Sequence, residues 1–357
     1  MNDLARHLAS QIRLHGPLTI AAYMAAALGH PKWGYYISRD PLGRAGDFVT
    51  APEVSQMFGE LIGLWCLDRW QAIGAPERFI LAELGPGRGT LMADALRAAG
   101  AQPAFGAAAE LHLVEISPVL RAAQEKALIG RKVTWHERIE ELPQGPGPAL
   151  VIANEFFDAL PIHQFQRTAK GWHERMVGVA DDTLHVVLNP AANPSALNFE
   201  APLDGIVEVS PARDAAVSAL AQYIMHRGGA ALIIDYGHGT SAPGDTLQAM
   251  RAHKYVDPFL NPGEADLTSH VDFQALGAAA HGAGAATHGP VSQGSFLNHL
   301  GISVRAERLC RSATESQTQD IASALHRLTA QDQMGQLFKV MAITPRDGSA
   351  PPGFEET

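Results

Sequence analysis

Hydrophobic residues recur at helical spacing through the first 75 residues of the chain. We expect two short helices at 3–15 and 18–29, with Gly16-Pro17 between them, and then a loop that begins at His30 and runs to Asp47. A third helix is expected at about 52–73, because its apolar residues fall at the i, i+3, i+4 positions of one helical face. These residues are Val54, Met57, Phe58, Leu61, Ile62 and Trp65. The pattern predicts a helical cap over residues 1–75.

Short apolar runs alternate with helical segments after this cap. Strands are expected at 79–82, 111–114, 133–135 and 150–153. Helices are expected at about 91–99 and from Ser117-Pro118, a pair typical of a helix N-cap and first turn. Strand and helix follow one another at the spacing of βαβ units on a parallel sheet. The predicted fold class is therefore α/β, with a Rossmann-like sheet.

The pattern changes between about 162 and 210. Residues 164–167, 172–179 and 183–188 look like short strands joined by polar turns, which predicts an antiparallel β insertion. A buried strand at 230–234 resumes the α/β pattern, followed by a helix at about 271–281, a strand near 284–288, further helices to about 332 and a last strand at 337–343. The expected domains are the cap at 1–75, the core at 76–161 and 225–345, the insertion at 162–224 and a polar tail at 346–357.

The composition narrows the class of partner. The net charge of −10 argues against nucleic acid, which is bound by clustered Lys and Arg, and suits a cationic substrate. Two cysteines and sixteen histidines, without CxxC or HExxH spacing, predict neither a disulfide framework nor a metal site. The N-terminus is amphipathic without a long apolar run, so we expect no membrane span, no signal peptide and a cytoplasmic protein. Oligomeric state is left open.

A glycine-rich turn follows the strand at 79–82. Its glycines, Gly85, Gly87 and Gly89, are spaced GxGxG, and Thr90 stands where a dinucleotide fingerprint has its third glycine. Glu83 lies two residues before the first glycine, where it would repel a pyrophosphate. S-adenosylmethionine has no phosphate and carries an ammonium and a sulfonium, which a carboxylate favours. The turn therefore predicts S-adenosylmethionine as cofactor, and a purely structural turn is the alternative.

Glu115 follows the strand at 111–114. An acidic side chain there can accept hydrogen bonds from both ribose hydroxyls of an adenosine cofactor. Enzymes that use NAD share this feature, so Glu115 supports an adenosine cofactor without selecting one. A surface glutamate at the start of a helix is the alternative.

The loop after the strand at 150–153 reads NEFFDALP and should border the transferred group, because ligands bind at the carboxyl ends of parallel strands. Carboxylates pair with guanidinium, and aromatic faces accept it by stacking. The loop thus points to an arginine substrate held by Glu155, with Asp158 as a weaker catalytic partner and Asn154 contacting the cofactor. In the alternative reading, Asn154 and Asp158 cap a turn and Phe156 and Phe157 are core residues.

The segment GDFVTAPE at 46–53 combines two patterns. Thr50 and Glu53 fit a capping box at the start of the third helix. Asp47 and Phe48 precede the cap, and we expect them to close over the cofactor, with Asp47 near its ammonium group.

Several polar residues further along the chain have open roles. Asp235, Tyr236 and His238 end the strand at 230–234 and could line a substrate channel, although a helix cap suits Asp235 equally well. Asp266 and Thr268 fit caps of the helix at 271–281. The remaining residues of this kind are His270, read as structural, and Gln293, for which function and structure are balanced.

These motifs together resemble the MidA-type methyltransferases, relatives of mitochondrial complex I assembly enzymes. The resemblance is carried by GDFVTAPE, ELGPGRGTL (83–91), NEFFDALP (154–161), DYG (235–237), DLTSHVDF (266–273) and Gln293-Gly294, and it covers about residues 5–343. It implies a class I methyltransferase that dimethylates arginine on a subunit of the hydrophilic arm of complex I. Residues Glu83, Gly85, Gly87 and Glu115 would then contact the cofactor, and Glu155 the substrate.

The resemblance also bears on location and on competing functions. A chain without a clear transit peptide is expected to be a bacterial, cytoplasmic member, whereas eukaryotic relatives work in the mitochondrial matrix. Three alternatives stay open at this point: a non-catalytic assembly chaperone with the same fold, a methyltransferase acting on small molecules, and an NAD-dependent oxidoreductase.

Overall fold

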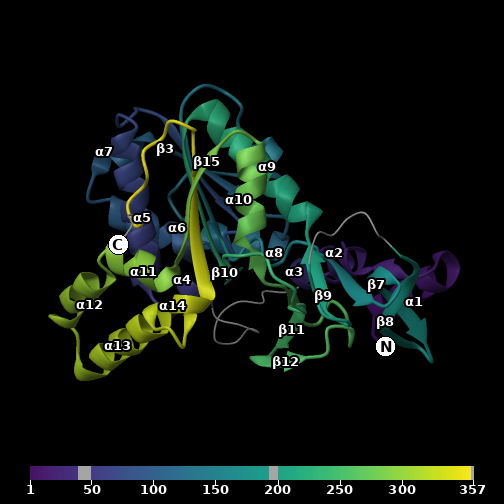
Figure 1. Ribbon diagram of the computed structural model, residues 1–357. Helices are drawn as coiled ribbons and strands as arrows, with labels where there is room; N and C mark the ends of the chain where they lie inside the picture. Colours follow the sequence, from purple (N-terminus) through teal and green to yellow (C-terminus); the bar gives the residue numbers. More distant parts are fainter. Residues whose placement is uncertain (39–49, 193–199, 355–357) are drawn as a thin grey trace. The chain divides into compact units, whose positions relative to one another are not determined.

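The computed structural model describes residues 1–38, 50–192 and 200–354 (Figure 1). They form two compact units. The larger unit comprises Val49–Phe157, Ala215–Gly239 and Val271–Thr357, and the smaller unit comprises Met1–Phe48, Asp158–Asp214 and Thr240–His270. The larger unit combines helices with a mixed sheet, which confirms the expected α/β class.

The central sheet of the larger unit has the strand order β15-β16-β10-β5-β2-β3-β4, with β14 beside β10. The strands β10, β5, β2, β3 and β4 run parallel, whereas β16 runs antiparallel to both β10 and β15. Their bounds are β2 Phe79–Leu84, β3 Ala109–Val114, β4 Val133–His136, β5 Ala149–Asn154, β10 Gly229–His238, β14 Val271–Asp272, β15 Ala286–Ser292 and β16 Phe338–Thr344. Every residue of β2 and β5 is buried, as expected for central parallel strands.

Helices cover both faces of this sheet, with α5 on one side and α9 and α10 on the other (Figure 1). Their bounds are α4 Ala51–Val54, α5 Gln56–Ala72, α6 Thr90–Ala99, α7 Pro103–Ala108, α8 Pro118–Ala127, α9 Pro211–Arg227, α10 Phe273–Gly282, α11 Gln293–His299, α12 Ile302–Cys310, α13 Glu315–Thr329 and α14 Met334–Leu337, with a 3₁₀ turn at Ile139–Glu141. The first four residues of α9 fall in the smaller unit.

The prediction of one continuous helix at 52–73 is wrong, because the structure has two helices there, α4 and α5. Ser55 has extended backbone angles, φ −163° and ψ 140°, and separates α4 from α5. Its hydroxyl accepts a hydrogen bond from the Met57 amide (3.2 Å), so Ser55 is the N-cap of α5. The apolar spacing continues across this break, and a periodicity argument therefore does not detect it.

The smaller unit holds a five-stranded antiparallel sheet, in which β7 pairs with β6, β8 and β1. A three-stranded sheet, β12-β11-β13, completes its strands. The bounds are β1 Leu18–Thr19, β6 His163–Thr168, β7 Gly171–Ala180, β8 Thr183–Ala192, β9 Ile206–Val209, β11 Gln248–Arg251, β12 Lys254–Val256 and β13 Asp266–Thr268. The three expected strands of the insertion are thus present and antiparallel, and β9 was not foreseen.

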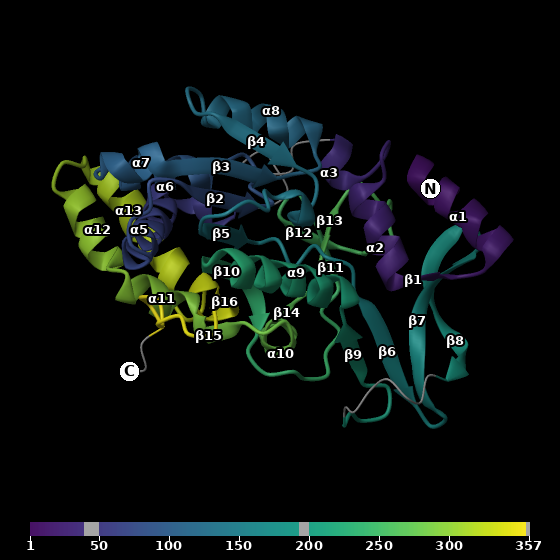
Figure 2. The same ribbon diagram turned by 90° about the horizontal axis from the view of Figure 1, so that it is seen from above.

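The N-terminal helices α1 (Asp3–His15), α2 (Ile20–Gly29) and α3 (Tyr35–Ser38) belong to this smaller unit, whereas α4 and α5 belong to the larger one. Figure 2 shows α1 and α2 beside β1 and β7. Residues Leu4, Leu8 and Ile12 of α1 share a core with strand residues of the insertion. The observed grouping therefore cuts across the cap expected at 1–75. Residues 18 and 19 are strand rather than helix, because they pair with Val177 and Met176.

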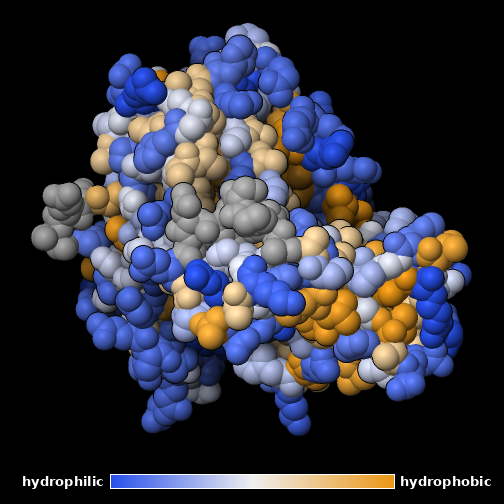
Figure 3. Space-filling model, turned by 45° about the vertical axis from the view of Figure 1, so that its right-hand side comes forward, coloured by the Kyte–Doolittle hydropathy of each residue, from blue (hydrophilic) through white to orange (hydrophobic). Residues whose placement is uncertain are grey.

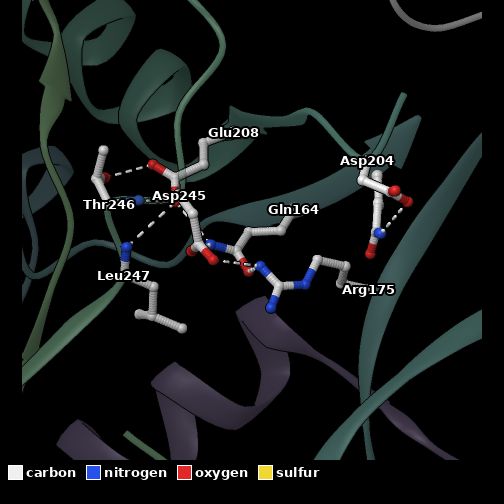
Figure 4. Close-up of polar contacts among 8 residues, drawn as sticks. Gln164, Arg175, Asp204, Glu208, Asp245, Thr246 and Leu247 are labelled. Carbon is white, nitrogen blue, oxygen red and sulfur yellow. Dashed lines mark hydrogen bonds and ion pairs between the residues drawn. The ribbon is translucent and has the colours of Figure 1, made fainter. Parts of the chain in front are cut away.

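A polar network joins the loop at 245–247 to the sheet of the smaller unit (Figure 4). The amide of Gln164, a side chain with 1% exposure, donates to Glu208 Oε1 (2.7 Å) and Asp245 Oδ1 (2.8 Å). Arg175 Nη1 donates to Gln164 Oε1 (3.0 Å) and Asp245 Oδ2 (2.8 Å). Glu208 also accepts the amides of Thr246 and Leu247. Most buried polar atoms of this network are thereby paired, as burial favours, although Arg175 Nε has no partner among the described residues.

The surface is mixed in character. Figure 3 shows hydrophobic patches among hydrophilic side chains. The most exposed large hydrophobic side chains of the smaller unit include Leu14 (76%), Tyr255 (71%), Leu203 (67%) and Leu260 (60%). Across the described ranges, no helix has the length and apolarity needed to cross a membrane, and no group of three or more His, Cys, Asp or Glu residues is arranged to hold a metal ion.

Candidate active site

The glycine turn connects the end of β2 to the start of α6. Gly85, Gly87 and Gly89 have φ values of 60°, 55° and 83°, in the left-handed region that favours glycine. The Gly85 amide donates to the Val114 carbonyl of the neighbouring strand (3.0 Å), and the Gly89 amide donates to Pro86 (2.8 Å). A Cβ at Gly85 would lie 3.0 Å from the Phe156 ring. The turn thus brings bare backbone to the carboxyl end of the sheet.

Glu83 is buried in β2 two residues before this turn. Its side chain is 2% exposed, and Oε2 has no hydrogen-bond partner among the described residues. Burial raises the pKa of this carboxyl to about 8. An ionised carboxylate in such a buried position is stable only beside a cation. Among the described residues, no cationic side chain is paired with Glu83.

Glu115 follows β3 and is also buried, with 7% exposure. Its Oε1 accepts the Ser117 amide (2.7 Å), and its Oε2 accepts Gln124 Nε2 (3.2 Å). Burial raises the pKa of this carboxyl, although these hydrogen bonds act in the opposite direction. The side chain is therefore held in one orientation beside the glycine turn.

Gln124 of α8 was missed by sequence reasoning. Its Nε2 donates to the Gly87 carbonyl (2.7 Å) as well as to Glu115, and its Oε1 accepts Trp135 Nε1 (2.8 Å). One fully buried amide thus fixes the glycine turn and the acidic loop relative to each other. The available signal was a polar residue on the buried face of an amphipathic helix, but its partners lie in three separate segments.

The end of β5 carries Asn154 and Glu155. Asn154 Oδ1 is buried without a hydrogen-bond partner in the described ranges, and Nδ2 donates to Glu155 Oε1 (3.2 Å). Glu155 has a φ of 50°, and its amide donates to Ile234 of β10 (2.9 Å). Its Oε1 also accepts the Ala51 amide at the start of α4 (3.1 Å). A non-glycine residue in the left-handed region is uncommon and is here held by contacts on both sides.

Asp235 fixes the loop that follows Glu155. Asp235 Oδ2 accepts the Phe157 amide (2.9 Å), and Oδ1 accepts the Tyr236 amide (2.9 Å). The residue is fully buried within β10, so the helix-cap reading is wrong. Its neighbour His238 lies with Nε2 3.8 Å from Asp272 Oδ2.

Asp158 belongs to the smaller unit and is 6% exposed. Its carbonyl accepts hydrogen bonds from the Ser269 amide and from Arg213 Nη2, each at 3.1 Å. Burial, followed by the charges of Asp266 and Asp158, raises the pKa of Tyr36. Asp158 therefore anchors its own loop, and its catalytic role stays a prediction.

Two site residues expected from the sequence, Asp47 and Phe48, lie outside the described residues. The capping box expected next to them is wrong. Thr50 is the N-cap of α4 but makes no side-chain cap hydrogen bond. Glu53 instead reaches α6, where its Oε1 accepts the Thr90 hydroxyl (2.6 Å) and its Oε2 lies 4.0 Å from Arg88 Nη1.

The segment DLTSHVDF also differs from expectation. Asp272, not Asp266 or Thr268, caps α10 by accepting the Ala275 amide (3.0 Å). Asp266 accepts the Tyr36 hydroxyl (2.8 Å) within the smaller unit. His270 contributes its backbone to Thr246 and Arg213. Gln293, the first residue of α11, is fully buried and donates to the Leu328 carbonyl (2.9 Å).

Comparison with known proteins decides what this constellation is. Residues 61–291 match the family described as "Putative S-adenosyl-L-methionine-dependent methyltransferase". The chain belongs to this family. The mouse protein arginine methyltransferase NDUFAF7, mitochondrial, is 40% identical over 375 residues, covering 97% of this chain and 85% of its own. The human counterpart is 38% identical over 376 residues, covering 97% and 84%.

A solved structure of a family relative agrees with this assignment. A Burkholderia thailandensis protein crystallised with S-adenosylhomocysteine matches 99% of this chain and 94% of its own, with a TM-score of 0.88 and 30% identity. The native structure from the same organism has a TM-score of 0.84 at the same identity. The cofactor expected from the glycine turn, S-adenosylmethionine, is thus that of the family.

The residues at the sheet end fit this cofactor. The unpaired Oε2 of Glu83 and Oδ1 of Asn154 are buried acceptors at the ends of adjacent strands, and they suit an ammonium group. The left-handed glycines leave the backbone free of side-chain atoms, and the Ser117 amide and Gln124 hold the Glu115 carboxyl in place. Burial without a partner is costly for these acceptors unless a ligand supplies the donors.

Proposed function

We propose that this methyltransferase transfers the methyl group to an arginine of a protein substrate, and that Glu155 binds the guanidinium. The observation that carries this proposal is the placement of Glu155 at the end of β5, beside Asn154. Its Oε1 already accepts N–H groups from Ala51 and Asn154, which is the kind of donor that guanidinium presents. The relatives named protein arginine methyltransferase support the same substrate class.

The cofactor is assigned to the edge where β2, β3 and β5 end, as in a class I, Rossmann-like methyltransferase sheet. We assign the ammonium group to Glu83 and Asn154, the backbone approach to Gly85, Gly87 and Gly89, and the ribose hydroxyls to Glu115. The parallel strands with one antiparallel neighbour, β16, support this topology. Ligands of parallel α/β sheets bind at this end of the strands.

Glu155 has two tasks in the proposed reaction. The bound cofactor supplies an electrophilic methyl carbon whose transfer leaves a neutral thioether. By pairing with two guanidinium nitrogens, Glu155 localises the positive charge and leaves the third nitrogen oriented for an in-line approach. As the new N–C bond forms, that nitrogen would release a proton to solvent, because both oxygens of Glu155 are paired with the other two nitrogens. Asp235 supports this geometry by holding the Phe157 amide.

The substrate protein and the compartment are further parts of the proposal. We propose a basic, arginine-bearing protein, with a subunit of the hydrophilic arm of respiratory complex I as the first candidate from the family resemblance. The net charge of −10 supports a cationic partner. The bacterial cytoplasm is the proposed location, and the free state of both Cys66 and Cys310 supports a reducing compartment.

Labelling in a deletion-strain lysate tests the proposal. The purified protein is incubated with the lysate and with S-adenosylmethionine carrying a radioactive methyl group, and acid hydrolysates are searched for labelled methylarginines. We expect one or few labelled protein bands, and we expect Glu155→Gln to lower their labelling about 100-fold. Glu125→Gln, at an exposed position of α8, is the matched control and should label normally.

The possible outcomes separate the competing functions. Label found only in small metabolites would replace the arginine substrate with a small molecule. Absence of any label, together with restored growth of the deletion strain by Glu155→Gln, would indicate an assembly chaperone. Equal labelling by Glu155→Gln and the wild type would remove Glu155 from the reaction.

A further inference from the structure

The four-residue helix α4 is held at both ends by carboxylates. It spans Ala51–Val54 between the N-cap Thr50 and the break at Ser55. The amide of Ala51, its first residue, donates a hydrogen bond to Glu155 in the loop after β5. The carboxylate of Glu53, its third residue, accepts the Thr90 hydroxyl at the start of α6. A short helix has little stability of its own, so its place depends on these two polar contacts together with its packing against α5, α6 and α13.

The contact with α6 is short and directional. The Thr90 hydroxyl donates to Glu53 Oε1 at 2.6 Å, and Arg88 Nη1 lies 4.0 Å from Glu53 Oε2. Thr90 is the first residue of α6, and its N-cap Gly89 has no side chain with which to cap the helix. The Glu53 carboxylate therefore fixes the segment that directly follows the three glycines. Gln124 holds the middle of the glycine turn at Gly87, whereas Glu53 holds Thr90, the residue that follows the turn.

The contact with Glu155 is equally specific. Ala51 is fully buried, and its amide reaches Glu155 Oε1 at 3.1 Å, the same oxygen that accepts Asn154 Nδ2 at 3.2 Å. Only Pro52 separates Ala51 from Glu53, and its ring restricts the backbone φ angle. A displacement of Glu53 therefore moves the Ala51 amide, because the backbone between them has little conformational freedom.

We propose that α4 couples the glycine turn to Glu155, with Glu53 and Thr90 as positioning residues. The inference rests on the proposed function, because it takes the glycine turn as the cofactor site and Glu155 as the substrate carboxylate. Ordering of the turn by the cofactor fixes Thr90, Thr90 holds Glu53, and α4 then fixes the Ala51 amide on Glu155. The arginine site is thereby oriented in the cofactor-bound enzyme, so that occupancy of one site favours the other.

Hydrogen exchange of α4 measures this coupling with S-adenosylhomocysteine as the probe. Saturating S-adenosylhomocysteine should slow exchange of the Ala51, Glu53 and Val54 amides about tenfold in the wild type. Thr90→Val removes the hydroxyl donor, and the slowing should then disappear even though the probe is still saturating. Thr90→Ser keeps the donor and should restore the slowing.

A second measurement, on a second variant, keeps the coupling testable if one of the variants fails to fold. The dissociation constant of S-adenosylhomocysteine should rise about five- to tenfold in Thr90→Val and in Glu53→Ala, and the double variant should be no weaker than either single one. Thr287→Val is the matched control, because it removes a hydrogen bond of 3.0 Å between His281 Nε2 and the hydroxyl of Thr287 on β15, the edge strand four places from β2 in the sheet. It should change neither readout.

The outcomes that overturn the coupling differ from those that overturn the proposed function. Full slowing of α4 exchange in Thr90→Val, or additive losses of affinity in the double variant, would refute the role of Glu53 and Thr90 while leaving the cofactor site intact. Failure of the wild type to bind S-adenosylhomocysteine at all would refute the cofactor site itself, and the coupling with it.

Discussion

Glu83 is a single buried residue whose proposed role in cofactor binding opposes its effect on stability. A carboxyl with 2% exposure and an unpaired oxygen in the described ranges is unfavourable in the protein alone, and burial raises its pKa to about 8. We propose that the same carboxyl pairs with the ammonium group of the cofactor. The motif that predicted this residue from the sequence therefore marks a position where function and folding oppose each other.

The pH dependence of stability tests this opposition. The folded pKa of Glu83, about 8, lies above its ordinary value of 4.5, so the folded protein retains a proton that the unfolded chain has lost. The contribution of Glu83 to the free energy of unfolding is thus complete below about pH 4.5 and falls by about 1.4 kcal/mol per pH unit until about pH 8. Glu83→Gln carries no ionisable group and should lack this decline.

Urea denaturation of the cofactor-free protein at pH 5 and pH 8.5 provides the measurement. Glu83→Gln should be more stable than the wild type at pH 8.5, with a much smaller difference at pH 5, while its affinity for S-adenosylhomocysteine falls. The exposed Glu125→Gln variant should follow the wild type at both values. A stability difference between Glu83→Gln and the wild type that does not vary with pH would contradict a buried, neutral Glu83.

At the scale of elements, the sequence predicts what is local. The strands that become β2, β3 and β5 and the Ser117-Pro118 start of α8 follow from apolar runs and cap residues, and the structure contains them. The sequence does not predict how these elements pair with segments far away along the chain. Leu18 is in a strand because it pairs with β7, and Glu53 accepts the Thr90 hydroxyl of α6 instead of completing a capping box with Thr50. In both cases a tertiary contact replaces a local one.

The contact between α5 and α6 depends on glycines that the apolar pattern did not single out. A Cβ on Gly63 would lie 2.4 Å from the Ala95 carbonyl oxygen and 2.5 Å from Ala95 Cα, both backbone atoms. Gly63→Ala should therefore force the helices apart and lower the free energy of unfolding by about 3 kcal/mol, measured by urea denaturation.

Gly282→Ala is the matched control for this helix contact. Gly282 is the last residue of α10, and a Cβ there would have no atom within 4 Å. The variant should be as stable as the wild type or more stable, since alanine favours helix. If Gly63→Ala were equally well tolerated, the close approach of α5 to α6 would be refuted.

At the scale of the whole molecule, the polar contacts that join distant segments were beyond sequence reasoning. Gln164 bonds to both Glu208 and Asp245, which lie 44 and 81 residues further along the chain. Gln124 likewise reaches Gly87 and Glu115 from a helix. Such partners depend on three-dimensional placement, whereas the acid beside the glycines was predictable because its role is local to one turn.

Net charge is a property of the whole chain that the sequence does give, and it leads to a prediction about substrate encounter. A field from a net charge of −10 attracts a basic protein over distances comparable with the Debye length, about 10 Å at 0.1 M salt. Raising KCl from 50 to 300 mM should therefore lower kcat/KM for the labelled protein substrate about five- to tenfold, mainly through slower association. S-adenosylhomocysteine is a zwitterion without net charge at pH 7, and its dissociation constant should change less than about twofold over the same range. Rates of methyl transfer that stay constant with salt, at unchanged cofactor affinity, would show that the acidic surface does not guide the substrate and would favour an uncharged or small-molecule acceptor.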